Sequence, residues 1–307
     1  MNEAQNNISF VIYTYRYNTY SGGTMVLHYL CHLLNQQKYT KAYIWPNYKP
    51  LYNSKEPFKS TLKFLKYWRK SLHKKFALNP SWNTPLATKK DLDNSIIIYP
   101  EIVEGNPLMA NKVVRWLLHK PGFHFGKIQF GESELILGYG QKFSTPEFTI
   151  TDANTFHIAY IMDDIYIQTN FKKRVGTCHM IRKGTNKPLL HEKDSICVDG
   201  MSHQELAKVF NECETFICYD PYTYYSVYAA LCGCKSIVIP DDNVSKEQWH
   251  PQEKDRYGIA YGLNEEEITY AQETLQLLKN DIKKQQNNNQ KELDKFLNLC
   301  KTHFKDQ

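Results

Sequence analysis

The sequence predicts an α/β protein with two domains, and three features of the chain lead to this prediction. The chain has 307 residues, which is long for one average domain and sufficient for two. Short apolar segments of strand length alternate with segments whose apolar residues recur at helical spacing, as in parallel sheets joined by helices. A second series of strands begins at 176–181, after the crossover that we place near 171–174. We expect one domain at 1–165, another at 166–285, and a cleft between them.

The first domain is expected to start with a strand at 8–15, followed by Gly22-Gly23 and a helix. A strand, two glycines and a helix can together bind a phosphate through backbone N–H groups. A tight turn with close helix packing explains the same glycines equally well, because the lysine of a P-loop is missing. Further strands are expected at 41–45, 95–99 and 156–162, and a further helix at 110–119.

A polar loop follows the strand expected at 95–99. It contains Glu101, Gly105 and Asn106. Open α/β sheets bind their ligands at the carboxyl ends of the strands, so these three residues are candidates for the wall of a cleft. The alternative is a turn of glycine and proline that binds nothing.

The segment 215–242 predicts one βαβ unit of the second domain. It contains a strand at 215–218, a helix capped by Thr223 and ended by Gly233, and a strand at 236–239. A helix N-terminus after such a strand can bind an anion. The turn also carries Asp220 and many hydroxyl groups, on Tyr222, Thr223, Tyr224, Tyr225, Ser226 and Tyr228.

The other elements of the second domain and the C-terminal region follow from the same signals. A strand is expected at 195–198, and a helix at 202–212 with a capping box formed by Ser202 and Glu205. The chain should end in two helices, at 265–280 and 291–304. The stretch 285–290 between them is so polar that we expect an exposed linker, whereas the last helix has one apolar face, formed by Leu293, Phe296, Leu297 and Cys300.

Composition favours a cytoplasmic protein. The first residues, MNEAQNN, are unlike a secretory signal, and the longest apolar runs are well short of the roughly 20 residues of a membrane helix. The eight cysteines contain no CxxC pair, which favours buried free thiols over a metal site or disulfides.

The net charge of +6 is concentrated in one segment, 59–75, which has seven basic residues and no acidic one. Its apolar residues fall near one helical face. Such a basic amphipathic helix can lie on an anionic membrane or meet an acidic substrate, and an ordinary domain helix with a solvated cationic face is an equal alternative. No nucleic-acid-binding motif accompanies the charge, so nucleic acid is not expected as a partner.

Arg182-Lys183 follows the strand at 176–181 and forms an informative pair with the turn that starts at Asp220. A nucleotide-sugar needs cations for its pyrophosphate and polar groups for its hydroxyls. Fixed cations near the β-phosphate would also stabilise the charge that grows when the sugar leaves, without a metal ion.

Several segments spread along the chain resemble bacterial GT-B glycosyltransferases, close to the retaining family 4 type enzymes of lipopolysaccharide and capsule assembly. They are SGGTMVLHYLCHLLN, IIIYPEIVEGNPL with NKVVRWLLHKPG, MIRKG, CYDPYTYYSVYAALCGC and YGIAYG. The resemblance implies two Rossmann-like domains and sugar-donor binding mainly in the second. It also implies acceptor binding mainly in the first and a final helix, 286–307, that packs back on the first domain.

The resemblance also assigns roles to individual residues. Arg182 and Lys183 match the basic pair that holds the donor diphosphate, and Gly22-Gly23 matches the glycine loop that faces donor and acceptor. Asp220 and Tyr228 match the two ends of the family's Glu-x7-Glu pattern. At position 228 a phenol replaces the family's carboxylate, which accepts hydrogen bonds from the ribose. The change is compatible with altered nucleotide preference, weaker donor binding or loss of activity. It is also compatible with a helix whose side chain at 228 is part of the core.

The predicted function is therefore transfer of a hexose-type sugar from a nucleotide-diphosphate-sugar to a glycan or lipid-linked glycan acceptor, with retention and without a cofactor. The alternative is a non-catalytic GT-B scaffold that binds nucleotide or glycan. A histidine base would serve an inverting enzyme, and His124 is the candidate. The candidate residues are Arg182, Lys183 and Asp220 for catalysis; Gly22, Gly23, Arg182, Lys183, Asp220, Tyr222, Thr223, Tyr224 and Tyr228 for the sugar donor; and Glu101, Gly105, Asn106 and His124 for the acceptor.

Overall fold

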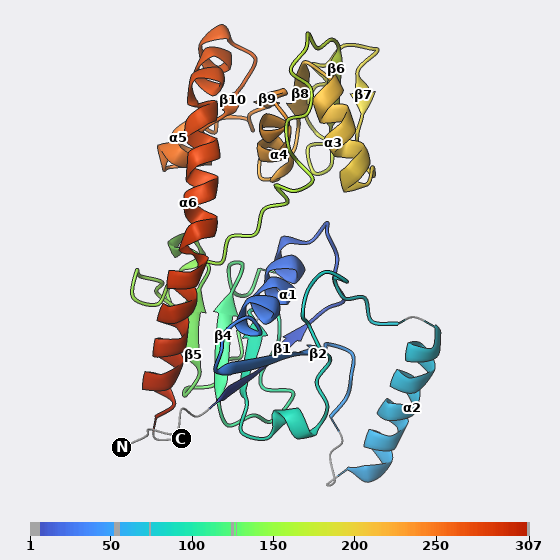
Figure 1. The fold of residues 1–307 in the computed structure, drawn as a ribbon, viewed down its shortest axis with the longest axis vertical. Helices are drawn as coiled ribbons and strands as arrows, with labels where there is room; N and C mark the ends of the chain where they lie inside the picture. Colours follow the sequence, from blue (N-terminus) through green and yellow to red (C-terminus); the bar gives the residue numbers. More distant parts are fainter. Residues whose placement is uncertain (1–6, 52–55, 74, 124–125, 127, 306–307) are drawn as a thin grey trace. The chain divides into compact units, whose positions relative to one another are not determined.

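The computed structural model describes residues 7–51, 56–73, 75–123, 126 and 128–305 (Figure 1). The chain divides into two compact units, Met1–Tyr160 with Asn288–Gln307, and Ile161–Asn287. Each unit contains a five-stranded parallel sheet, which confirms the α/β class. The second unit begins before the segment 171–174 in which we expected the crossover.

The sheet of the first unit has the strand order β2-β1-β3-β4-β5. Helix α1, Gly22–Leu34, and the C-terminal part of α6, Glu265–His303, pack on one face of this sheet. The ring centroid of Phe296 in α6 lies 5.5 Å from that of Phe10 in the first strand. The apolar face expected on the last helix is confirmed, because Leu293, Phe296 and Cys300 are buried in this core. The strands are β1 Ile8–Thr14, β2 Thr40–Pro46, β3 Ile96–Pro100, β4 Val113–Leu117 and β5 Leu135–Gly138.

The other face of this sheet is covered largely by connecting segments. Val103 and Leu108, from the connection between β3 and β4, pack there against Trp45 and Tyr99. Outside the sheet, the unit also contains α2, Pro57–His73, and two short 3-10 helices, Lys90–Leu92 and Gln141–Phe143.

The prediction of a helix at 110–119 is wrong, because this segment contains β4. All five residues of β4 are buried between β3 and β5. A strand that is buried on both faces is a continuous apolar run without alternation. The periodicity of such a run does not distinguish a strand from a buried helix.

The prediction of a strand at 156–162 is also wrong. Thr155 forms an isolated bridge to Gly138, and the Phe156 N–H donates to the Gly138 carbonyl at 2.8 Å, but no strand is formed in 156–162. Ala159 instead bonds through its N–H and C=O to the side chain of Asn289 in α6.

The second unit has the strand order β10-β9-β8-β6-β7. Counted within each unit, both sheets have the order second, first, third, fourth, fifth. The connections therefore leave in opposite directions on either side of the first and third strands, β6 and β8 here, which is the point where such sheets bind ligands. The strands are β6 Thr177–Met180, β7 Ile196–Cys197, β8 Thr215–Cys218, β9 Lys235–Val238 and β10 Ile259–Tyr261.

The second unit also contains the N-terminal part of α6, three shorter helices and one 3-10 helix. The shorter elements are α3 His203–Glu212, α4 Tyr225–Leu231, α5 Lys246–Trp249 and the 3-10 helix Glu253–Arg256. The capping box expected at α3 is confirmed. The Glu205 N–H donates to Ser202 Oγ at 3.4 Å, and the Ser202 N–H donates to the Glu205 carboxylate at 2.8 Å.

Helix α6 is continuous for 39 residues, so the prediction of two helices with an exposed linker at 285–290 is wrong. No glycine or proline interrupts this polar stretch; three of its six residues are glutamines, which are good helix formers, and the other three are asparagines. Asn289 is buried, since its side chain bonds to Ala159. Among the described helices, none is long and apolar enough to cross a membrane.

Candidate functional site

Arg182 lies in a tight loop directly after β6 and has a left-handed backbone, with φ +41°. A non-glycine residue in this region carries a strain on the order of 1–3 kcal/mol. The carboxylate of Asp199 holds the loop, because it accepts from the N–H groups of Ile181 at 2.7 Å and Arg182 at 3.2 Å. The backbone of this loop is therefore fixed in an unfavourable conformation by an acidic side chain that follows β7.

The same loop is packed closely on the end of β8. A Cβ at Gly184 would lie 2.2 Å from the Tyr219 carbonyl oxygen, so only glycine allows this approach. The buried Tyr219 hydroxyl accepts from the N–H groups of Leu190 at 2.7 Å and His191 at 3.1 Å. These contacts fix both ends of the segment that follows Arg182.

The side chain of Arg182 extends to the turn after β8. Its Nη1 donates to Thr223 Oγ1 at 3.1 Å, its Nε lies 3.8 Å from Asp220 Oδ2, and its Cζ lies 5.3 Å from the Tyr225 ring centroid. The Arg182 side chain is 33% exposed, whereas that of Asp220 is 6% exposed. The structure thus places a partly exposed cation where β6 and β8 end side by side.

The other predicted residues around this turn differ in accessibility. Lys183 is exposed and forms no hydrogen bond or ion pair with the described residues. Tyr222 and Tyr224 are 64% and 45% exposed.

Thr223 is not the cap of α4, which corrects the sequence prediction. The helix begins at Tyr225, the N-cap residue is Tyr224, and no side-chain hydrogen bond caps it. The Thr223 hydroxyl instead accepts from Arg182. Because α4 has only seven residues, we assign the positive charge of this site to Arg182 and Lys183 rather than to the helix end.

Tyr228 is buried, with 4% of its surface exposed. Its ring stacks on that of Tyr166, with centroids 4.0 Å apart and an interplanar angle of 8°. The rings of Tyr224 and His203 lie edge-on to it. This placement favours the alternative in which the side chain at 228 has become part of the core, over a contact with a ribose.

Two residues that hold the site were missed in the sequence. Asp199 was not considered, although Asp199-Gly200 follows a strand just as Asp220 does. Lys187 was also missed; its Nζ donates to the Ile239 carbonyl at 2.6 Å and lies 2.8 Å from Asp241 Oδ1. An acidic residue within three positions of the ends of β7, β8 and β9 is the signal that could have identified Asp199 and Asp241.

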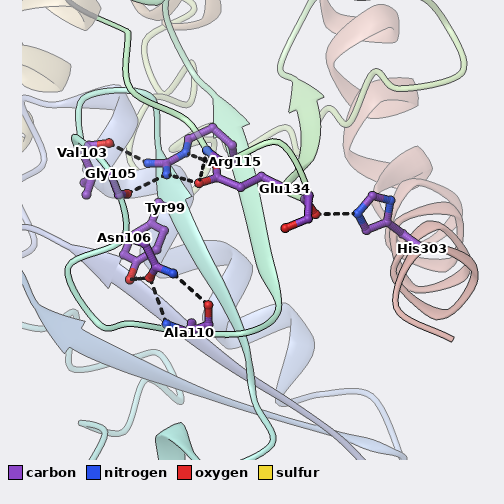
Figure 2. Close-up of polar contacts among 10 residues, drawn as sticks. Tyr99, Val103, Gly105, Asn106, Ala110, Arg115, Glu134 and His303 are labelled. Carbon is purple, nitrogen blue, oxygen red and sulfur yellow. Dashed lines mark hydrogen bonds and ion pairs between the residues drawn. The ribbon is translucent and has the colours of Figure 1, made fainter. Parts of the chain in front are cut away.

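In the first unit, Asn106 makes local contacts that stabilise a turn. Its Oδ1 accepts from the Tyr99 hydroxyl and the Ala110 N–H, each at 3.0 Å, and its Nδ2 donates to the Ala110 carbonyl at 2.8 Å. Figure 2 shows this network beside Arg115. The side chain of Asn106 therefore explains the shape of the loop without a ligand.

The loop 101–112 is organised by Arg115, which is fully buried. Its guanidinium forms two bonds to Glu134, at 2.8 Å and 2.9 Å, and donates to the carbonyls of Val103 at 2.6 Å and Gly105 at 2.8 Å (Figure 2). Arg115 was missed because the segment around it was predicted to be a helix.

Glu101 also contacts the backbone of its own unit. Its Oε2 accepts from the Leu118 N–H at 2.9 Å. Burial raises the pKa of Glu101 above its ordinary value, although this bond opposes the change. His124, the remaining candidate for the acceptor, lies outside the described residues.

Gly22 and Gly23 begin α1. Neither has a positive φ, and a Cβ at Gly22 would meet no described atom within 4 Å. At Gly23 the nearest atom would be Leu118 Cδ1, at 3.8 Å. Neither backbone strain nor packing within the described chain requires these glycines, so the alternative of a tight turn with close packing loses its support.

No model of a protein family matches this chain, and no curated protein matches it. Within the described part of the chain, no group of three or more histidine, cysteine, aspartate or glutamate side chains is arranged to hold a metal ion.

Proposed function

We propose that this chain is a glycosyltransferase of the GT-B class that takes a sugar from a nucleotide-diphosphate-sugar. The single observation that carries the proposal is the position of Arg182. Its guanidinium contacts Thr223 and Asp220 at the point where β6 and β8 end. The backbone of Arg182 itself is left-handed. Strained backbone that is held by surrounding contacts is typical of functional sites.

The chemistry of the site suits a leaving diphosphate. Arg182 and Lys183 provide two adjacent cations, and an arginine can bind phosphate oxygens through two parallel N–H bonds. Negative charge on the diphosphate increases as the bond to the sugar breaks. Cations that are already positioned near that oxygen stabilise the transition state more than the bound substrate.

The polar groups around Arg182 can serve the rest of the sugar donor. Tyr222 and Tyr224 are exposed, and a tyrosine hydroxyl can donate to or accept from the hydroxyls of a sugar or a ribose. In the proposal, a glycan of the lipopolysaccharide or capsule type is the acceptor. The reaction would then occur in the cytoplasm at the inner face of the membrane, with retention at the anomeric carbon.

Nucleotide-dependent stabilisation and turnover test the proposal. Thermal unfolding is measured with UDP, GDP, CMP and their sugars, and release of nucleotide from each stabilising sugar donor is then followed. We expect one nucleotide class to raise the melting temperature, and its sugar to be turned over. The variant Arg182→Gln with Lys183→Gln should lose both effects, whereas Lys208→Gln with Lys254→Gln, which changes two exposed lysines of the same unit, should keep them. Turnover that survives in the Arg182 and Lys183 variant would contradict the proposal.

A second candidate is a non-catalytic protein that binds a nucleotide or a glycan. It is favoured by the buried, stacked ring of Tyr228 and by Asn106, whose side chain is engaged within its turn. The two candidates differ in the experiment above. Stabilisation by a nucleotide without any turnover of its sugars supports the binding protein.

A further inference from the structure

Helix α2, Pro57–His73, exposes apolar side chains beside basic ones. Phe58 is 77% exposed, Leu62 44% and Leu65 51%. Positions i, i+4 and i+7 lie on one side of a helix, so these three side chains form one stripe, which Arg69 continues at i+11. The same spacing places the lysines along one side of the stripe. We call this surface the outer face of α2; its residues are Phe58, Lys59, Leu62, Lys63, Leu65, Lys66 and Arg69.

The opposite side of α2 makes the contacts with the first unit. Ser60 is buried, Phe64 and Tyr67 are half-buried, and the Tyr67 ring centroid lies 5.7 Å from that of Tyr48, which follows β2. Figure 1 shows α2 standing away from the sheet, beyond the edge formed by β2. The outer face is therefore dispensable for packing, and its exposed apolar residues need another explanation.

The charge of this helix is of one sign. Between Pro57 and His73 the chain has five basic residues and no acidic one. Lys59 pairs with Glu56 at 3.0 Å, but both side chains are largely exposed, and such pairs contribute little. Lys63, Lys66 and Arg69 have no acidic partner among the described residues. Lys74, at the end of the predicted basic segment, lies outside these residues.

We propose that the outer face of α2 binds the surface of a bilayer that contains anionic lipid. Phe58, Leu62 and Leu65 enter the region between the headgroups and the acyl chains, and the flanking basic residues bind lipid phosphates. A nucleic acid would neutralise the same charges but would leave the apolar stripe in water. This docking depends on α2 alone and holds whether or not the chain transfers a sugar.

Co-sedimentation of the full chain with lipid vesicles tests this inference. The vesicles contain phosphatidylcholine alone or with about 30% phosphatidylglycerol, at roughly 50 mM salt, where surface charge is weakly screened. We expect binding to the anionic vesicles and little binding to the neutral ones. No binding to anionic vesicles at this salt concentration would overturn the proposal.

Two variants separate the roles of charge and apolar surface. Lys59→Gln, Lys63→Gln and Lys66→Gln together should weaken binding about a hundredfold, since each basic residue near the surface contributes roughly fivefold. Leu62→Ser with Leu65→Ser should also weaken it, although the charge is unchanged. The control Lys283→Gln, Lys284→Gln and Lys301→Gln removes three exposed charges from α6 and should bind like the parent protein. All these side chains are exposed, so circular dichroism should show an unchanged fold.

The result for the leucine variant decides between a membrane and a nucleic acid. If Leu62→Ser with Leu65→Ser binds vesicles as tightly as the parent protein, the apolar stripe does not enter the bilayer and the proposal fails. It also fails if a 20-nucleotide RNA is bound more tightly than anionic vesicles and this binding is insensitive to the leucine changes.

Discussion

Arg182 donates a 3.1 Å hydrogen bond to the hydroxyl of Thr223, and this bond joins the loops that follow β6 and β8. The Arg182 side chain is one-third exposed, so it remains available to an anion while its position is fixed. A fixed cation loses less side-chain entropy on binding than a mobile one. The site in the second unit therefore depends on Thr223 as well as on the basic pair.

The Thr223→Val variant should bind a nucleoside diphosphate more weakly, because Arg182 loses the acceptor that orients it. A single hydrogen bond contributes about 0.5–1.5 kcal/mol, which corresponds to a dissociation constant roughly 2- to 10-fold larger. Thr223→Ser keeps the acceptor and serves as the control. Equal affinity of the valine variant and the parent protein, measured by titration calorimetry, would show that Thr223 does not position the guanidinium.

The buried pair of Arg115 and Glu134 should be needed for the stability of the first unit. Glu134→Ala leaves a buried guanidinium without its counter-charge, and we expect the free energy of unfolding to fall by about 3–5 kcal/mol. Urea unfolding, followed by the fluorescence of the buried Trp45 and Trp116, measures this change. Glu214→Ala removes an ion pair of similar length, 2.8 Å, from an exposed position and should change stability by less than about 1 kcal/mol. Similar small losses in both variants would contradict this role.

Asn289 should also stabilise the first unit, because its side chain pairs with the backbone of Ala159. The two bonds measure 2.9 Å and 2.8 Å, and both groups of Ala159 are removed from water. Asn289→Leu would leave an N–H and a carbonyl unpaired, and we expect a loss of about 1–3 kcal/mol in the free energy of unfolding. The neighbouring Asn288 is exposed, so Asn288→Leu should have little effect in the same urea titration.

Stability should increase with pH because of His28. Its Nε2 lies 3.0 Å from the Tyr15 carbonyl, which can only accept, so Nε2 carries the hydrogen of the neutral ring. The buried Nδ1 has no partner among the described residues, and its protonation would bury an unpaired N–H. Burial lowers the pKa of His28 below its ordinary value of 6.5, and burial also lowers the pKa of His179.

The sign of the pH effect follows from these two lowered pKa values. Below pH 6.5 these two histidines are protonated more readily in the unfolded chain than in the folded chain. The folded state therefore loses stability as the pH falls. The urea midpoint should therefore rise between about pH 5 and pH 7 and change little above that range. His28→Gln should reduce this slope, whereas His303→Gln, at an exposed position, should preserve it. Equal slopes for the parent protein and His28→Gln would contradict the lowered pKa of His28.

Most strands could be predicted from the sequence because local signals bound them. The apolar run of β3 ends at a proline, and that of β8 is followed by Asp220-Pro221. In both cases the length of the run and the residues that end it predict a strand. The run of β4 shows no alternation, because both of its faces are buried, and tertiary contacts determine it as a strand. In α6 the polar stretch around Asn289 was taken for a linker, since the partner that buries it, Ala159, is distant in the sequence.

The candidate site was predictable in part for a similar reason. Arg182 and Asp220 follow strands that could be recognised, and parallel strands bring their carboxyl ends to one edge. The role of Thr223 as the acceptor for Arg182, and that of Asp199 in holding the loop, depend on side-chain directions that the sequence does not contain. Asn106 also follows a strand, as expected, but its side chain bonds within its own turn. Its position in the sequence therefore does not indicate a ligand contact.

Titration of the nucleoside diphosphate selected by thermal stabilisation tests the central claim most directly. The dissociation constant is measured for the parent protein, for Arg182→Gln and for the control Lys208→Gln. Loss of a hydrogen-bonded charge contributes about 1.5–3 kcal/mol, so Arg182→Gln should bind roughly 10- to 100-fold more weakly. The control should bind like the parent protein. Equal affinity of Arg182→Gln and the parent protein would contradict a diphosphate site at the ends of β6 and β8.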